Sequence, residues 1–202
     1  VFLLVLCAVL WSTGGLLIKA VECNALALAG GRSAIAALTI YLLMPRQRFR
    51  LSAATLGAAA IYTAVVVLFV VANRLTTAAN AIFLQYTAPI YIALFGAALL
   101  GERATRLDWA LIALAQVGIA LFFLDRLNFD GWWGNLCALA SGLAYAGLTL
   151  LLRKERDGSP LEFVLAGNAM TAILCLPFSV TAWPNARSWL GLFALGVFQL
   201  GW

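Results

Sequence analysis

The 202-residue sequence contains no histidine, and it places its four cysteines without any CxxC or Cys/His spacing. Histidine is the commonest proton shuttle and metal ligand near neutral pH, so its absence argues against both kinds of site. Three of the cysteines fall inside apolar runs, so neither a zinc site nor a disulfide framework is indicated. We therefore predict no metal site and no cofactor; the cysteines are Cys7, Cys23, Cys137 and Cys175.

Acidic residues are also few, and none falls inside a long apolar run. A membrane-embedded enzyme needs a nucleophile and base, or metal ligands, at depth. The sequence offers neither, so we predict that the protein is not an enzyme. The eight carboxylates lie in loops or at the ends of runs: Glu22, Glu102, Asp108, Asp125, Asp130, Glu155, Asp157 and Glu162.

Apolar residues make up most of the chain. It is 64% hydrophobic and 10% charged with a mean hydropathy of +0.99, far above the roughly half-apolar balance of soluble domains. At about 1.5 Å per residue, runs of about 20 residues cross a hydrocarbon core of about 30 Å. The sequence predicts an all-α polytopic membrane protein with spans over residues 1–18, 25–44, 53–71, 77–100, 109–124, 134–152 and 161–180. A final run, 189–202, is too short to cross alone, so we expect the chain to stop within an eighth span.

The basic residues indicate orientation. With the N-terminus in the cytoplasm, the inner loops hold eight Lys or Arg and the outer loops hold four, which agrees with the positive-inside rule. The basic clusters are therefore topology signals and do not indicate nucleic acid. The inner residues are Arg46, Arg48, Arg50, Arg103, Arg106, Arg153, Lys154 and Arg156; the outer are Lys19, Arg74, Arg126 and Arg187.

The run over residues 77–100 carries polar groups that lipid would not tolerate, so they must face protein or water. Pro89 has no N–H to donate to the carbonyl of Gln85, which predicts a kink. A kink beside a polar stripe suggests a binding cavity, but hydrogen bonding between helices without a ligand would also explain the stripe. On a continuous helix the stripe contains Thr76, Thr77, Asn80, Thr87 and Tyr91.

The second half of the same run has small residues at every fourth position. Such spacing lets another membrane helix approach closely. We predict that Ala93, Ala97 and Gly101 form a helix-packing face.

Two other spans contain polar groups with two open interpretations. Arg32 lies near the middle of the second span, at a cost of about 3 kcal/mol, and is either a structural pin or a contact for a substrate carboxylate. In the first span, Gly14 and Gly15 favour close helix packing, whereas Trp11 and Ser12 would form a cavity wall.

An internal repeat relates the two ends of the chain. Leu6-Cys7-Ala8 matches Leu136-Cys137-Ala138, and Gly31-Arg32 corresponds to Gly167-Asn168. A five-span unit has an odd number of spans, so its second copy is inverted, an architecture that places a site at the midplane between two halves. We predict one unit over residues 1–125 and a partial second unit over 131–202.

These residues also carry a family resemblance. The segment from Leu75 to Pro89, ending Leu99-Leu100-Gly101-Glu102-Arg103, resembles the fourth-span signature of the drug/metabolite transporter superfamily in its ten-span EamA-type branch. Leu6–Ser12 and Gly31–Ala37 resemble the first and second spans of that branch. The resemblance implies ten spans in two inverted halves, a central cavity and export of small metabolites. The sequence departs from the pattern of this branch in two ways: it ends in span eight, and it has Asn24-Ala25 where a proline is usual before span two.

The Leu-Trp-Ser of span one and the Leu-Gln-Tyr-Thr-Ala-Pro of span four look most like bacterial inner-membrane exporters of amino acids, including aromatic ones. We predict a secondary exporter that works by alternating access, with a small-molecule substrate and the lipid bilayer as partners; no oligomeric state is indicated. Efflux of lipophilic cations, which would need an intramembrane carboxylate, and a structural subunit are the alternatives. We also expect that no titrating carboxylate in these spans drives export. The predicted substrate-binding residues are Trp11, Ser12, Arg32, Tyr62, Asn80, Gln85, Tyr86, Tyr145 and Asn168.

Overall fold

The computed structural model describes residues 14–43, 52–122, 124, 130–155, 159–181 and 185–200. Within these residues the regular secondary structure is helical, which confirms the predicted all-α class. The elements are α2 (Gly14–Ala20), α3 (Ala25–Leu43), α4 (Ala53–Leu75), α5 (Ala78–Gln85), α6 (Ala88–Leu100), α7 (Arg106–Phe122), α8 (Trp132–Lys154), α9 (Pro160–Thr181), α10 (Ala186–Ala194) and the π-helix η2 (Leu195–Leu200).

Five apolar stretches of the described chain are long enough to cross a membrane, as expected for a multi-pass membrane protein. They begin and end within a few residues of the predicted spans, because the length of an apolar run and the rise of a helix together determine where a span begins and ends. The stretches are Ala25–Leu43, Ala53–Leu75, Ala78–Leu100, Trp132–Lys154 and Pro160–Phe178.

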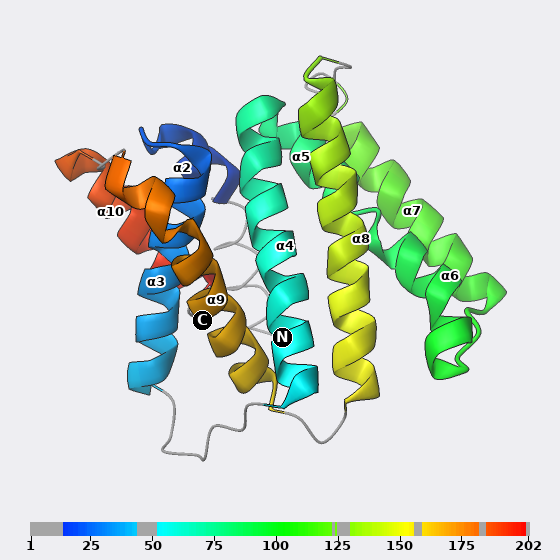
Figure 1. Ribbon diagram of the computed structural model, residues 1–202. Coiled ribbons are helices and arrows are strands. Elements are labelled where there is room, and N and C mark those ends of the chain that lie inside the picture. Colours follow the sequence, from blue (N-terminus) through cyan, green and yellow to red (C-terminus); the bar gives the residue numbers. More distant parts are fainter. Residues whose placement is uncertain are drawn as a thin grey trace.

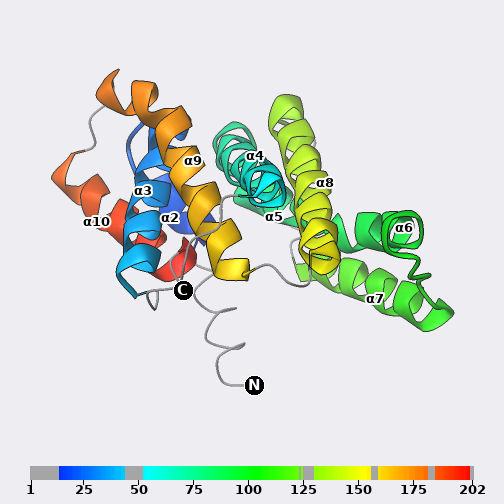
Figure 2. The same ribbon diagram turned by 60° about the horizontal axis from the view of Figure 1, so that its bottom comes forward.

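Helix α4 stands at the centre of the structure. It packs against α8 on one side and α9 on the other, and α9 in turn packs against α3 (Figure 1). Helices α6 and α7 lie beyond α8 (Figure 2). On the other side of the structure, α10 and η2 pack on α3, and α2 contacts α4. Helices from the first predicted unit, α3 and α4, thus pack directly on α8 and α9 from the second. The inverted relation between the two units stays a prediction.

The apolar core lies where α3, α4, α9 and α10 meet. Its buried side chains include Leu28, Val66, Val70, Cys175 and Leu192. Many other leucines lie exposed on the outer surface, with Leu190 at 74%. In water such a surface would be costly, but hydrocarbon solvates it without penalty, which fits helices that face lipid.

The span over Ala78–Leu100 is interrupted near its middle. Helix α5 ends at Gln85, and α6 starts at Ala88 after Tyr86 and Thr87. Pro89 lies in the first turn of α6, where its missing N–H leaves no helical hydrogen bond unmade. The Thr87 hydroxyl donates to the Leu84 carbonyl at 2.6 Å and supplies one of the partners that the break removes.

Glycines on α8 allow it to approach α4 and α5 closely. A Cβ atom at position 134 would lie 2.7 Å from the backbone nitrogen of Thr76, and one at position 142 would lie 2.9 Å from the carbonyl oxygen of Gln85. Gly131, at the start of α8, adopts a φ of 73°, a conformation that glycine tolerates best. The backbones of these segments are therefore in contact without intervening side chains.

The predicted packing face on α6 is not where the described residues make their close contact. Ala97 and Gly101 are exposed, and a Cβ at position 101 would meet no atom within 4 Å. Gly101 instead ends the helix with a φ of 72°. The buried glycine of this helix is Gly96, and α6 packs on α8. A role for Ala93, Ala97 and Gly101 in packing stays a prediction.

Candidate functional site

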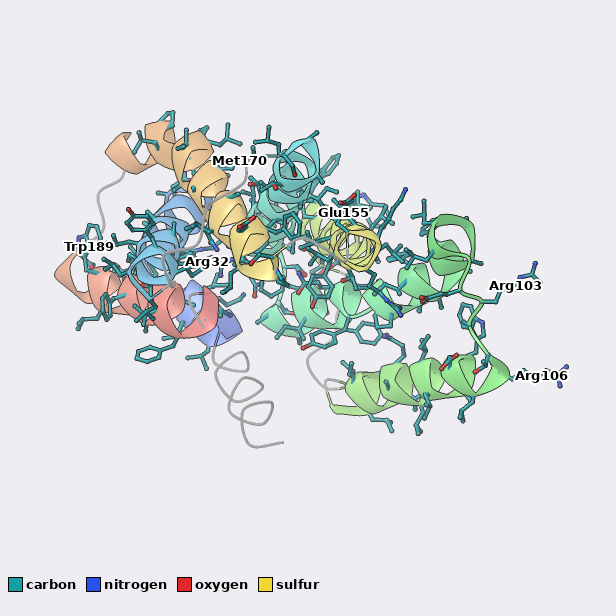
Figure 3. The ribbon with its side chains drawn as sticks, turned by 90° about the horizontal axis from the view of Figure 1, so that it is seen from below. Arg32, Arg103, Arg106, Glu155, Met170 and Trp189 are labelled. Atoms are coloured by element: carbon teal, nitrogen blue, oxygen red, sulfur yellow. The ribbon has the colours of Figure 1, made fainter. Side chains whose placement is uncertain are left out.

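Arg32 is buried between α3 and its neighbours with only 2% of its surface exposed. Its Nη1 donates to the Oε1 of Gln199 at 3.1 Å, and its buried Nε has no hydrogen-bond partner among the described residues. The ion pair found in the described chain, between Arg153 and Glu102, does not involve it. Figure 3 shows Arg32 within the group of helices, whereas Arg103 and Arg106 project beyond the helix ends. Arg32 is therefore a buried positive charge whose Nε–H can still donate a hydrogen bond.

Tyr62 of α4 is hydrogen-bonded to α9. The Nδ2 of Asn168 donates to the Tyr62 hydroxyl and to the Val164 carbonyl, both at 3.0 Å. The Oδ1 of Asn168 is buried and has no partner among the described residues. Arg32 lies on α3, which packs against both α4 and α9. We give the name Arg32 cluster to the polar residues that these helices and η2 carry there: Arg32, Gln199, Tyr62 and Asn168. Three of them, Arg32, Tyr62 and Asn168, are predicted substrate-binding residues.

Gly167 determines where the Tyr62 ring can lie. A Cβ at position 167 would come within 2.5 Å of Cδ1 of this ring, so only glycine leaves the space. One turn along α9, the Thr171 hydroxyl lies 3.0 Å from that of Thr63 and donates to the Gly167 carbonyl at 2.8 Å. This threonine pair fastens α9 to α4 beside the Arg32 cluster.

Gln199 is a member of the Arg32 cluster that the sequence analysis did not select. It lies on η2, and its side chain fills the space beside Gly14, where a Cβ would come within 1.7 Å of its Nε2. A single amide in the apolar run 189–202 was the available signal, because such a group must face protein. A π-helix is rare and is often found at functional sites.

Asn80 belongs to a second polar network, at the start of α5. Its Nδ2 donates to the Oγ1 of Thr76 at 3.2 Å and to the Oδ1 of Asn135 at 3.1 Å, and Thr76 donates to the same Asn135 oxygen at 2.9 Å. Asn80 is only 3% exposed. These contacts are the hydrogen bonding between helices that was the alternative to a ligand site.

Gln85 joins α5 to the middle of α8 and α4. Its Nε2 donates to the Ser141 hydroxyl at 2.8 Å, and Ser141 donates to the Val65 carbonyl at 3.0 Å. The Gln85 side chain is therefore part of a series of hydrogen bonds that links α5, α8 and α4. Binding of a substrate by Asn80 or Gln85 stays a prediction, and in this conformation it would require both to exchange partners.

We expect the contacts of Asn80 and Asn135 to be energetically coupled. Asn80→Ala and Asn135→Ala should each lower thermal stability, and the double variant should lose less than the sum, with a coupling near 0.6 kcal/mol, the average for hydrogen bonds between membrane helices. Thermal unfolding in detergent measures this cycle. Strictly additive losses would show that the contact carries no stability.

The remaining predicted aromatic and polar residues are not placed beside Arg32. Tyr86 and Tyr145 are 45% and 38% exposed. The Tyr86 carbonyl accepts a hydrogen bond from Gln116 of α7, so this residue lies at the break between α5 and α6. Trp11 and Ser12 fall outside the described residues.

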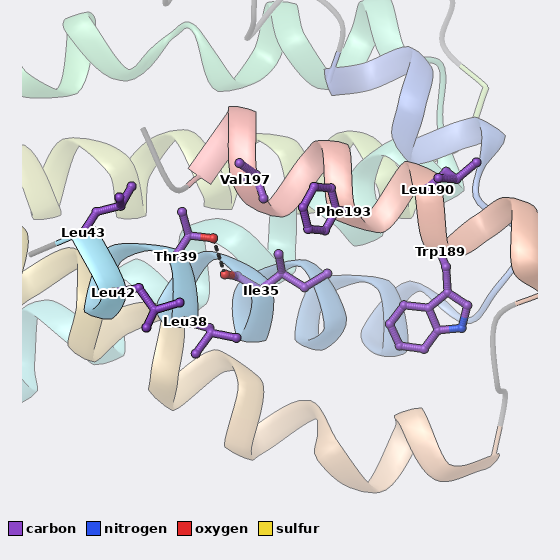
Figure 4. Close-up of a pocket in the computed structure, with 9 residues that line it drawn as sticks. All are labelled: Ile35, Leu38, Thr39, Leu42, Leu43, Trp189, Leu190, Phe193 and Val197. Atoms are coloured by element: carbon purple, nitrogen blue, oxygen red, sulfur yellow. Dashed lines mark hydrogen bonds between the residues drawn. The ribbon is translucent and has the colours of Figure 1, made fainter.

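A groove between α3 and the α10–η2 segment is almost entirely apolar (Figure 4). It has a volume of about 740 Å³. Its hydroxyl, on Thr39, already donates to the Ile35 carbonyl at 2.8 Å. With no free polar group to orient a metabolite, the groove is a weaker candidate than the Arg32 cluster. It is lined by Ile35, Leu38, Thr39, Leu42, Leu43, Trp189, Leu190, Phe193 and Val197.

Apolar spans around buried polar residues indicate a polytopic helical membrane protein. Residues 1–124 match the EamA-like transporter family, and the chain belongs to this family. It is a family of membrane transporters rather than enzymes, which confirms the coarser part of the predicted function: a transporter of small molecules in a lipid membrane.

Comparison with solved structures supports the fold. A crystal structure that is 21% identical in sequence superposes with a TM-score of 0.77, covering 96% of this chain and 73% of the other. At this identity the similarity concerns the fold alone. The search of curated proteins returned no match.

Proposed function

We propose that the protein exports amino acids, aromatic ones among them, and related small metabolites across the bacterial inner membrane as a secondary transporter. The observation that carries this proposal is Arg32, buried to 98% with an unpaired Nε and no carboxylate partner in the described chain. A buried charge without a partner is costly, so arginines at this depth pair with backbone, water or an anionic ligand. A substrate carboxylate would supply the missing partner.

Alternating access is supported by where the Arg32 cluster lies. Arg32 and Tyr62 belong to the first predicted unit, whereas Asn168 and Gln199 belong to the second. A site shared by two halves is exposed to each side when the halves rock against one another. The ten-span organisation and the cytoplasmic N-terminus are parts of the same proposal.

Efflux of lipophilic cations is less well supported. A buried cation site needs a carboxylate, and none of the buried residues in the described chain is acidic. Arg32 would instead repel a cation through a medium of low dielectric constant. The proposal keeps the expectation that no carboxylate of these spans drives export.

Transport by the purified protein in proteoliposomes tests the proposal. We expect counterflow of radiolabelled phenylalanine or leucine above that of empty liposomes, and a rise in melting temperature with the same compounds. Tetraphenylphosphonium should give neither effect. Uptake of this cation without any response to amino acids would favour drug efflux, and no response to any compound would favour a structural subunit.

A further inference from the structure

The Gln199 side chain covers part of the Arg32 guanidinium. Its Oε1 accepts a hydrogen bond from Arg32 Nη1 at 3.1 Å. Arg32 is 2% exposed, whereas Gln199 is only half-buried. A ligand can reach so deeply buried a guanidinium only where a neighbouring group moves aside. Gln199 is such a group, because its amide ends a flexible side chain and is joined to Arg32 by one hydrogen bond.

Two glycines allow the amide to lie there. A Cβ at position 196 would lie 2.8 Å from the carbonyl oxygen of Arg32, so η2 approaches the backbone of α3 closely at this residue. A Cβ at position 14 would lie 1.7 Å from Nε2 and 2.7 Å from Cδ of Gln199. The Gln199 amide therefore occupies a space between α2 and the Arg32 guanidinium that Gly14 leaves open.

A carboxylate is a better partner for this guanidinium than an amide. Arg32 carries five N–H donors, and its buried Nε has no partner among the described residues. Hydrogen bonds from a guanidinium to a carboxylate are charge-assisted, often bidentate, and about twice as strong as those between neutral groups. The single oxygen of the Gln199 amide neither neutralises the charge nor fills two positions of the fork. A carboxylate that reached Arg32 would therefore replace it.

We propose that Gln199 is a placeholder, which occupies Arg32 in the empty transporter and is displaced from Nη1 by the carboxylate of the substrate. This rests on the function proposed above and adds a residue that lowers the affinity for substrate, because binding must first break the bond between Gln199 and Arg32. A substrate has to leave as well as enter, and an amide that returns to Arg32 favours its release.

Replacing Gln199 gives effects of opposite sign. Gln199→Ala removes the competitor, so the phenylalanine or leucine concentration at half-maximal counterflow should fall about tenfold, the value of one hydrogen bond to a charged group. The melting temperature without substrate should also fall, because Arg32 loses its partner. Gln199→Glu supplies a permanent carboxylate, so the half-maximal concentration should rise by about 100-fold. Loss of a residue that only supports the fold would not tighten binding.

Gly14→Ala moves the same amide without deleting it. The atoms that the new Cβ would meet first belong to the end of the Gln199 side chain, which can rotate away. This variant should also tighten binding, and the double variant with Gln199→Ala should bind no more tightly than Gln199→Ala alone. Thr171→Val is the matched control. It removes a buried hydrogen bond between α9 and α4, so it should lower the melting temperature without tightening binding.

Weaker binding by Gln199→Ala, or a gain from Gly14→Ala that persists in the double variant, would overturn the placeholder role. Counterflow of amino acids by the wild type would still leave the proposed function standing in that case. Failure of the wild type to transport any carboxylate, or to be stabilised by one, would overturn the proposed function itself.

Discussion

Replacement of Arg32 by glutamine is expected to raise the substrate concentration needed for half-maximal export by more than about 100-fold. The guanidinium is the buried charge that a substrate carboxylate would meet, and removing one partner of a buried charge pair costs about 3–5 kcal/mol. Arg32→Lys keeps the charge but loses the planar fork of donors, so it should recover only part of the affinity.

The measurement separates a binding role from a structural one. The substrate concentration at half-maximal export from proteoliposomes reports on substrate binding. The melting temperature without substrate reports on the stability of the fold. Because Arg32→Gln removes an uncompensated buried charge, the substrate-free protein should be as stable as the wild type or more stable. A large loss of stability with an unchanged half-saturation concentration would identify Arg32 as a structural pin.

Gly134→Ala is expected to destabilise the protein by about 1–3 kcal/mol or more, the range for overpacked cores. The new Cβ would lie 2.7 Å from the Thr76 nitrogen and 2.8 Å from the Leu75 carbonyl carbon. Backbone atoms cannot rotate away as the end of a side chain can, so α8 would have to move off the end of α4. That movement would also stretch the contact between Thr76 and Asn135.

Gly147→Ala provides the control on the same helix. A Cβ at position 147 meets no atom within 4 Å, so only the higher helix propensity of alanine remains, a gain of up to about 1 kcal/mol. Thermal unfolding of both variants in the same detergent gives the comparison. Equal stability of the two variants would contradict the close approach of α8 to α4.

The sequence could predict the spans because a span is a local property. Apolar length and helical rise place 25–44 and 53–71 close to the observed α3 and α4. It could also predict that polar groups within spans face protein. It could not distinguish a ligand contact from a helix contact, because the partner of Asn80 lies 55 residues away in sequence.

Two other differences have physical causes. The stripe over residues 76–91 was placed on one continuous helix, but the chain has a break at Tyr86 and Thr87, so one helical wheel does not describe the residues on both sides of it. Gln199 was overlooked because its run is too short for a span, and its contact with Arg32 joins residues 167 positions apart.

The break between α5 and α6 divides this span at Tyr86 and Thr87. The Tyr86 carbonyl is bonded by Gln116 of α7, and that of Leu84 by the Thr87 hydroxyl, so both carbonyls have a partner outside the regular helical pattern. A change in the angle of α6 alters the dihedral angles of two residues and leaves the hydrogen bonds within α5 and within α6 intact. What resists it is the packing of α6 on α8. A change in the angle between α5 and α6 would therefore leave the Gln85–Ser141 contact, on the α5 side of the break, in place.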